Sequence, residues 1–271
     1  MSILEYIMSS FIIPTSTTCS RVLNANPLTI ICCYFGCWSI QLFSKLNFYG
    51  YLEMKTTKII AVVNPKGGVG KSNTCKNLGR GLQKKGFLVL LGDTDPQASL
   101  NEWRLTDPES NQPEVVVMAN NNALLSEIEK ANHNNLDFFI IDGMAMDFRM
   151  TMNLMSVANL VLLPLQPSPD DTVFLSELVN LVELNRLKRK GHPVAAFLLN
   201  LVDARENLTG KVKEALESLS LPILQTHIKR RSAFKNASAE GKTVYDKKGE
   251  DYQACARMVD DLIAEILRLL K

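Results

Sequence analysis

One glycine-rich stretch constrains the fold of this chain more than any other feature. It reads Pro65-Lys66-Gly67-Gly68-Val69-Gly70-Lys71-Ser72, and it lies between the apolar run 59–63 and a helical pattern over about 72–85. A loop that leaves a buried strand and opens a helix directs several backbone N–H groups at one place, where the helix N-terminus adds partial positive charge. The sequence therefore predicts a loop that binds phosphate.

The residue types in this loop suit that chemistry. Its glycines lack a Cβ, so a phosphate can approach the backbone closely. They are Gly67, Gly68 and Gly70. Lys71 supplies a cation for the β- and γ-phosphates, and the Ser72 hydroxyl can ligate Mg²⁺. The general pattern has glycine where this chain has Pro65, and Lys66 precedes the glycine pair instead. The order strand, loop, helix argues against the alternative, a glycine-rich turn without a ligand.

The rest of the chain repeats a strand–helix rhythm. Short apolar runs rich in β-branched residues and leucine alternate with helical segments, as expected for parallel strands buried on both faces. The further runs are 88–91, 138–141, 160–163 and 194–199, with a short strand at 115–117. We predict an α/β fold with a doubly wound, mostly parallel sheet, helices on both faces and a single domain over 54–271.

Three carboxylates follow predicted strands. Asp93 and Asp95 come after the run 88–91, and Asp142 comes after the run 138–141. Ligands bind outside the carboxyl ends of strands in open parallel sheets, so these side chains should converge near the glycine-rich loop. Carboxylates beside phosphates imply a divalent cation and an activated water. For any one aspartate, the alternative is a helix N-cap.

The N-terminal residues 1–53 differ from the rest of the chain. They hold only four charged residues and an uncharged apolar run of 17 residues, 27–43, which is at the lower limit for crossing a bilayer. A transmembrane anchor and a secretory signal are two interpretations, although Glu5 precedes any basic residue. We favour a third, a start codon placed too far upstream, so that Met54 begins the functional domain 54–271.

Charge and cysteine content exclude some functions. The formal net charge is +2, so any contact with nucleic acid requires a local patch. The six cysteines form no Cys-x-x-Cys pair or zinc-ligand spacing, which argues against a zinc site or a disulfide framework. Cys75 and Cys255 are expected to be small buried apolar residues in a reduced cytoplasm.

Four stretches carry a resemblance to the ParA/MinD group of deviant Walker ATPases, which covers about residues 56–271. Within the group, the chain looks most like the small ParA proteins of plasmid partition. The first stretch is highly specific, the next two moderately so, and the last is weak alone. They are Asn64 to Ser72, Asp93-Thr94-Asp95-Pro96-Gln97, Leu163-Pro164-Leu165-Gln166-Pro167-Ser168 and Glu240-Gly241-Lys242-Thr243-Val244.

The resemblance implies roles in binding and hydrolysing ATP with Mg²⁺. Lys66 would cross to the phosphates of a partner subunit in an ATP-sandwich homodimer, Lys71 would act within its own subunit, and Asp95 would orient the attacking water. Mg²⁺ would be held by Ser72, by Asp142 and, through water, by Asp93. The nucleotide would contact Gly67, Gly68, Val69, Gly70, Lys71, Ser72 and Asn73.

The chain departs from the family pattern at two places. Ser72-Asn73 replaces the usual Thr-Thr pair and keeps the hydroxyl ligand, whereas the segment 143–146 replaces the prolines that often follow the strand-end aspartate. Asn200 ends a predicted strand, where it could either contact adenine or cap a turn.

Two basic clusters stand out from the near-neutral chain. Lys229, Arg230 and Arg231, with Lys235 nearby, occur where related proteins place arginines that bind DNA without sequence preference. Contacts from a few cations to phosphates would be weak and sensitive to salt. The other cluster, within 186–190, is interpreted as helix C-terminal charge that complements the helix dipole.

The C-terminal segment 251–271 has apolar residues at helical spacing. MinD-type relatives use a basic amphipathic helix at this place on membranes, but acidic residues dilute the basic face here. We therefore expect a last helix packed on the core, and membrane association is disfavoured.

The first functional hypothesis is a cytoplasmic, nucleoid-associated ATPase of DNA partition. It would dimerise on ATP, bind DNA nonspecifically and release it on hydrolysis, which a centromere-binding adaptor of the ParB type would stimulate. The alternative is a membrane-associated positioning ATPase of the MinD type. A bacterial tyrosine-kinase module would need a C-terminal tyrosine cluster, and only Tyr245 and Tyr252 lie in that region. A nitrogenase-like iron–sulfur carrier is disfavoured because no suitable cysteine pair follows Asp142.

Overall fold

The computed structural model describes residues 56–166, 172–203, 216 and 219–271. The N-terminal extension 1–53, with its apolar run, lies outside these residues, as do Pro167 and Ser168. The segment Met54–Lys271 forms one compact unit. Among the described helices, none combines the length and the apolar character that crossing a membrane requires.

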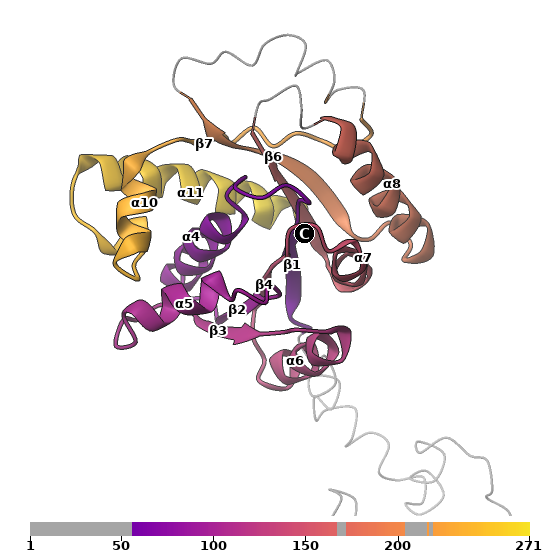
Figure 1. Cartoon of the computed structure of the whole chain (residues 1–271), viewed down its shortest axis with the longest axis horizontal. Coiled ribbons are helices and arrows are strands. Elements are labelled where there is room, and N and C mark those ends of the chain that lie inside the picture. Colours follow the sequence, from indigo (N-terminus) through magenta and orange to yellow (C-terminus); the bar gives the residue numbers. More distant parts are fainter. Residues whose placement is uncertain (1–55, 167–171, 204–215, 217–218) are drawn as a thin grey trace, which may run out of the picture. The chain divides into compact units, whose positions relative to one another are not determined.

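The unit is built on one seven-stranded sheet in which the strands run parallel (Figure 1). Its order is β3-β2-β4-β1-β5-β6-β7. The strands are β1 (Lys58–Val62), β2 (Val89–Asp93), β3 (Glu114–Val117), β4 (Phe138–Asp142), β5 (Leu160–Leu165), β6 (Val194–Val202) and β7 (Ile228–Lys229). The predicted α/β fold with a doubly wound sheet is confirmed, and the predicted strands agree with the observed ones to within about two residues except at the end of β6.

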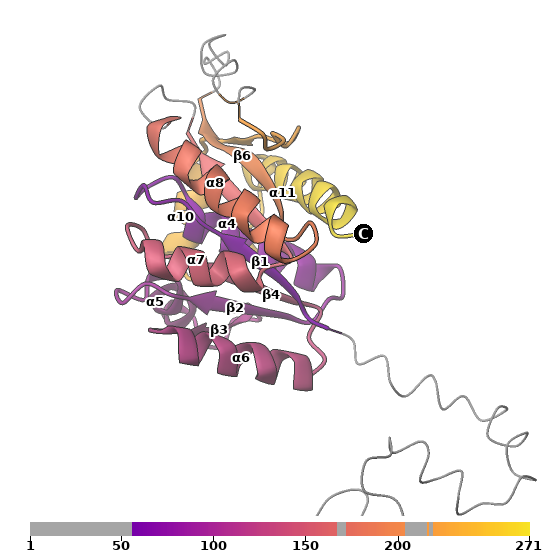
Figure 2. The same ribbon diagram turned by 90° about the vertical axis from the view of Figure 1, so that its right-hand side faces the viewer.

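Helices cover both faces of the sheet (Figures 1 and 2). One layer contains α4 (Lys71–Lys84), α5 (Ser99–Thr106), α10 (Ser232–Ala239) and α11 (Glu250–Leu269). The other contains α6 (Asn121–His133), α7 (Phe148–Val157) and α8 (Thr172–Lys188). A short 3₁₀ turn, η3 (Val244–Asp246), precedes α11.

The central strand β1 shows why its sequence is continuously apolar. Side chains alternate across a strand. Ile59 and Ala61 belong to the core beneath α6, α7 and α8, whereas Ile60 and Val62 belong to the core beneath α4 and α11. Because helices cover both faces, every position of the strand after Lys58 is buried.

The C-terminal helix α11 packs on the core, as expected from its sequence. Its buried face includes Cys255, Val259 and Ile263. α11 lies against α4, the helix that follows the glycine-rich loop. A Cβ built on Gly81 of α4 would lie 2.5 Å from the Ile263 Cδ1 atom, so glycine allows this close approach.

A buried ion pair joins α4 to η3. The Arg80 Nη2 atom lies 2.8 Å from Asp246 Oδ1, and the two side chains are 10% and 14% exposed. Gln112 and Thr243 donate hydrogen bonds to the other carboxylate oxygen, at 2.7 and 2.6 Å. Burial alone would raise the pKa of Asp246, but these hydrogen bonds and the charge of Arg80 outweigh it and lower the pKa.

The Asp246→Asn variant is expected to have a free energy of unfolding about 3 kcal/mol lower than the wild type, because Arg80 would remain buried without its partner charge. Because the pKa of Asp246 is lowered in the folded protein, this contribution to stability is fully present at pH values above 3.8, the ordinary pKa of aspartate. The contribution is lost as the pH falls through the still lower pKa of the folded protein. Urea unfolding at neutral pH and at about pH 3 should therefore show a smaller difference between variant and wild type in acid.

Asp261→Asn, which removes an exposed carboxylate from α11, is the matched control and should change stability by less than about 0.5 kcal/mol. Equal losses for the two variants would contradict a special role of the Arg80 pair.

Candidate functional site

The glycine-rich loop joins β1 to α4 at the carboxyl end of the sheet. Gly68 and Gly70 adopt positive φ angles, 77° and 89°, which glycine reaches without strain. A Cβ built on Gly67 or Gly68 would meet no atom within 4 Å, so this side of the loop opens to space. A Cβ on Gly70 would lie 2.5 Å from the Asn200 Nδ2 atom. The loop is thus packed on one side and open on the other.

Asn64 holds the start of the loop. Its Oδ1 atom accepts the N–H of Lys66 at 2.8 Å, and its Nδ2 atom donates to the Pro164 carbonyl at 2.8 Å. From the end of β5, the Gln166 Nε2 atom donates to the Gly68 carbonyl at 3.1 Å. These positioning roles were not predicted, although all of these residues lie in the stretches that carry the resemblance.

Asn200 holds the other end of the loop. It is fully buried, and its Nδ2 atom donates to the Val69 carbonyl at 2.8 Å. Its Oδ1 atom accepts the N–H of Leu201 at 3.0 Å. These contacts are the ones expected if Asn200 fixes a turn; contact with adenine stays a prediction.

Two lysines occupy different positions in the loop. Lys71 is buried, and its Nζ atom donates to the Lys66 carbonyl at 3.0 Å. Burial lowers the pKa of Lys71, and the nearby Asp142 carboxylate opposes this effect. The side chain of Lys66 is exposed. One lysine is therefore buried beneath the loop and the other is exposed at its surface.

Asp142 lies at the same level of the sheet as the strand ends beside it. In the parallel register it pairs with Val62 of β1 and with Asp93 of β2. The Asp142 side chain is only 4% exposed, and its Oδ1 atom has no hydrogen-bond partner among the described residues. Burial raises its pKa to about 7, and a hydrogen bond with Ser72 partly offsets that rise.

The Ser72 hydroxyl and a buried carboxylate oxygen of Asp142 that no described residue contacts by a hydrogen bond form a donor set that fits a hard divalent cation. The residues predicted to hold Mg²⁺, Ser72 and Asp142, are therefore brought together. A cation here would favour the charged form of Asp142, which burial alone disfavours.

Asp93 has a different environment from Asp142. It is fully buried, and its Oδ1 atom accepts the N–H of Asp95 at 3.0 Å. Its Oδ2 atom accepts the N–H groups of Leu100 and Asn101, in the first turn of α5, at 2.8 and 3.3 Å. These contacts are those of the alternative considered for each aspartate, a carboxylate that caps a helix. A role in metal binding through water stays a prediction.

Asp95 lies at the rim of the site and is partly exposed. Its Oδ1 atom accepts the N–H of Gln97 at 2.9 Å, which shapes the turn before α5. The adjacent Thr94 joins two loops, because its hydroxyl donates to the Asp142 carbonyl at 2.8 Å and accepts the N–H of Met144 at 2.9 Å. Thr94 thus holds the loop after β4, the segment 143–146 that departs from the expected family pattern.

The predicted DNA-binding cluster lies between β6 and α10. Lys229, Arg230 and Arg231 are exposed, and Lys235 on α10 is exposed too. The Arg230 N–H donates to the Val202 carbonyl at 2.9 Å, so the sheet fixes the backbone here.

The second basic cluster, within 186–190, makes contacts inside the folded domain. Arg189 donates to the Ala158 and Met155 carbonyls at 2.6 and 3.4 Å, at the end of α7. Arg186 pairs with Glu183 at 2.8 Å within α8. Arg189 therefore contacts carbonyls at the end of α7, whereas the sequence predicted that it would complement the dipole of the helix that precedes it.

Comparisons with known proteins agree on this architecture. The family model described as "CobQ/CobB/MinD/ParA nucleotide binding domain" matches residues 60–244. The chain is 29% identical over 209 residues to "Maintenance of carboxysome distribution protein A" of Halothiobacillus neapolitanus, covering 77% of this chain and 95% of that protein. It is 26% identical over 249 residues to "Sporulation initiation inhibitor protein Soj" of Bacillus subtilis, covering 76% and 98%.

The fold is also similar to a solved structure, the septum site-determining protein MinD of Pyrococcus horikoshii complexed with Mg-ADP. The TM-score is 0.57 at 20% sequence identity, covering 79% of this chain and 99% of that chain.

Proposed function

Because the chain belongs to the CobQ/CobB/MinD/ParA family of nucleotide-binding domains, we propose that it is an ATP-hydrolysing switch of DNA partition. ATP binding would form a sandwich homodimer that holds DNA without sequence preference, and hydrolysis would release it. The observation that carries the proposal is the pair of lysines in one loop, Lys71 buried beneath it and Lys66 exposed.

The open side of the loop suits the phosphates of a nucleoside triphosphate. Residues 67–73 would surround the phosphates, and Lys71 would contact the β- and γ-phosphates from its own subunit. Ser72 and Asp142 would hold Mg²⁺, which neutralises phosphate charge when it is bound. The missing partner of the Asp142 Oδ1 atom, among the described residues, supports this assignment.

Hydrolysis would depend on positioning. Asp95 lies at the rim, where its carboxylate would orient a water toward the γ-phosphate. Lys66 would reach the phosphates of the partner subunit, so dimerisation would complete each site. Catalysis of phosphoryl transfer is mostly positioning and charge stabilisation, so a lysine supplied by the partner would tie turnover to dimer formation.

The proposed partners follow from the exposed cluster of Lys229, Arg230 and Arg231. Such a cluster would contact phosphates of DNA without reading bases. We propose a cytoplasmic protein that attaches transiently to the nucleoid, with a ParB-type adaptor that stimulates hydrolysis at the centromere. The functional unit in this proposal is 54–271.

Replacing both Arg230 and Arg231 by alanine is expected to weaken ATP-dependent DNA binding about tenfold, because two phosphate contacts are lost. The slope of log affinity against log salt should fall in magnitude by about two. Fluorescence anisotropy with a labelled duplex of random sequence, over a salt series, measures both quantities.

A double variant with Lys84→Ala and Lys188→Ala is the control, because it removes the same charge from two other exposed positions. Unchanged DNA retention by the arginine variant, even at low salt, would contradict the assignment of the DNA-binding surface.

A second candidate is the same cycle with a protein cargo. The name of the Halothiobacillus relative, maintenance of carboxysome distribution, supports this alternative. The MinD-type membrane alternative is less favoured because the apolar residues of α11 are buried in the core. Sedimentation with ATP, once with DNA and once with anionic lipid vesicles, separates the membrane alternative from the two DNA-binding candidates, because retention by vesicles and not by DNA would favour the membrane.

A further inference from the structure

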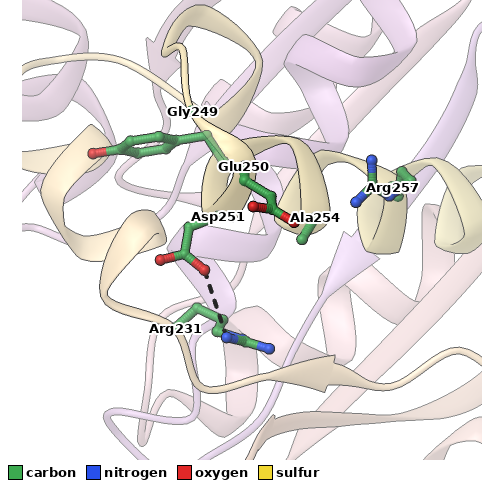
Figure 3. Close-up of a pocket in the computed structure, with 7 residues that line it drawn as sticks. Arg231, Gly249, Glu250, Asp251, Ala254 and Arg257 are labelled. Carbon is green, nitrogen blue, oxygen red and sulfur yellow. Dashed lines mark ion pairs between the residues drawn. The ribbon is translucent and has the colours of Figure 1, made fainter.

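Both arginines of the proposed DNA-binding cluster contact a carboxylate of their own chain. The Arg230 Nε atom lies 3.1 Å from Asp203 Oδ1, at the end of β6. The Arg231 Nη1 atom lies 3.6 Å from Asp251 Oδ1, in the first turn of α11, and Figure 3 shows this pair. The two arginine groups that would contact phosphate are thus engaged within the chain.

The surroundings of Arg231 are almost balanced in charge. Arg231 lines an open pocket with residues of α11 (Figure 3). Two cations, Arg231 and Arg257, and two carboxylates, Glu250 and Asp251, line it together with Gly249, Tyr252 and Ala254. A phosphate that approaches Arg231 would therefore also meet the negative charge of Asp251.

We propose that the carboxylates of Asp203 and Asp251 occupy the sites beside the two arginines where DNA phosphates would bind. DNA binding would then exchange a carboxylate for a phosphate on each arginine. This proposal rests on the proposed DNA-binding function and adds its regulation. Carboxylate and phosphate present similar oxygen acceptors to a guanidinium, so one can replace the other on the same N–H donors.

The strength of the two pairs suits such an exchange. All four side chains are about half exposed or more, between 43% and 71%. Exposed ion pairs contribute little to stability, so a phosphate can displace the carboxylate at small cost. Asp251 also lies at the N-terminus of α11, where the helix dipole favours its negative charge after release.

The exchange predicts that removing either carboxylate tightens DNA binding. Asp203→Asn and Asp251→Asn are each expected to raise the affinity for a labelled random-sequence duplex about two- to fivefold in the presence of ATP. The full chain is used at about 0.15 M salt, where screening confines the effect to nearby charges. The double variant should combine the two gains.

Asp261→Asn is the matched control, since it removes the same charge from the same helix. Asp261 lies ten residues after Asp251, about 15 Å along α11 and beyond the screening length of about 8 Å. Its DNA affinity should equal that of the wild type. A gain of the same size in the control would attribute the effect to net charge and overturn the proposal.

The outcomes separate this proposal from the one on which it rests. If the arginine variant loses DNA binding while the Asp203 and Asp251 variants bind as the wild type or more weakly, the exchange is wrong and the DNA-binding surface stands. If neither the arginine nor the aspartate variants alter DNA binding, both proposals fail.

Discussion

The Lys71→Ala variant is expected to lose ATP affinity by about thirtyfold to several thousandfold, the range that loss of one partner of a buried charge pair produces. The Lys71 Nζ atom already lies at the loop, 3.0 Å from the Lys66 carbonyl, and burial lowers its pKa. Bound phosphates would favour the charged form of Lys71, which burial alone disfavours. Calorimetric titration with ATP and Mg²⁺ measures the loss.

Lys76→Met is the matched control for this variant. Lys76 lies on the same helix and is buried to the same extent, 8% exposed. Its Nζ atom, however, donates to Ser238 Oγ at 3.1 Å and lies 5.3 Å from the centroid of the Trp103 ring, whereas the Lys71 Nζ atom donates to a carbonyl of the loop. The control should retain ATP binding even if it loses stability. Equal ATP affinity in wild type and Lys71→Ala would refute the assignment of the loop.

The fold could be predicted from the sequence because its strands are buried on both faces. Ile59, Ile60, Ala61 and Val62 form a continuous apolar run since each face of β1 packs under a helical layer. Strand ends were less well predicted. β6 continues through Val202, beyond the apolar run 194–199, because it carries the pairing with β7. The two-residue strand β7 has no periodic signal of its own.

The site could be predicted where topology alone brings residues together. Ser72 and Asp142 meet because β1 and β4 are neighbours in parallel register. Topology could not separate Asp142 from Asp93, which ends the next strand at the same level. Their environments differ through contacts with α5, because the N–H groups of Leu100 and Asn101 donate to Asp93. Which aspartate accepts these N–H groups depends on where α5 begins. Sequence patterns do not define the first residue of a helix so closely.

The contacts of the basic residues depend on tertiary structure in the same way. Arg189 reaches the end of α7, some thirty positions earlier in the chain, and its place directly after α8 gives no sign of that partner. Asp251 lies twenty positions after Arg231, and the pair forms because α10 and α11 pack together. The sequence indicates which charges occur, whereas the fold decides which of them a ligand must displace.

The second large effect is expected for Asp95→Ala, which should retain ATP binding but lower turnover by about a hundredfold or more, the usual contribution of a residue that positions or activates water. Asp95 is partly exposed at the rim, so its loss removes neither a core contact nor a phosphate ligand. The ATP-bound dimer should accumulate, because its dissociation would require hydrolysis. Phosphate release and light scattering with ATP measure the two effects.

Asp95→Asn distinguishes chemistry from loop shape. The Asp95 Oδ1 atom accepts the N–H of Gln97 at 2.9 Å, and an asparagine oxygen can keep this hydrogen bond and the turn before α5. Only the negative charge that would hold the attacking water is removed. If Asp95→Asn is as slow as Asp95→Ala, the carboxylate itself is required. If Asp95→Asn turns over normally, Asp95 acts by shaping the loop, and the residue that orients water must be sought elsewhere at this edge of the sheet.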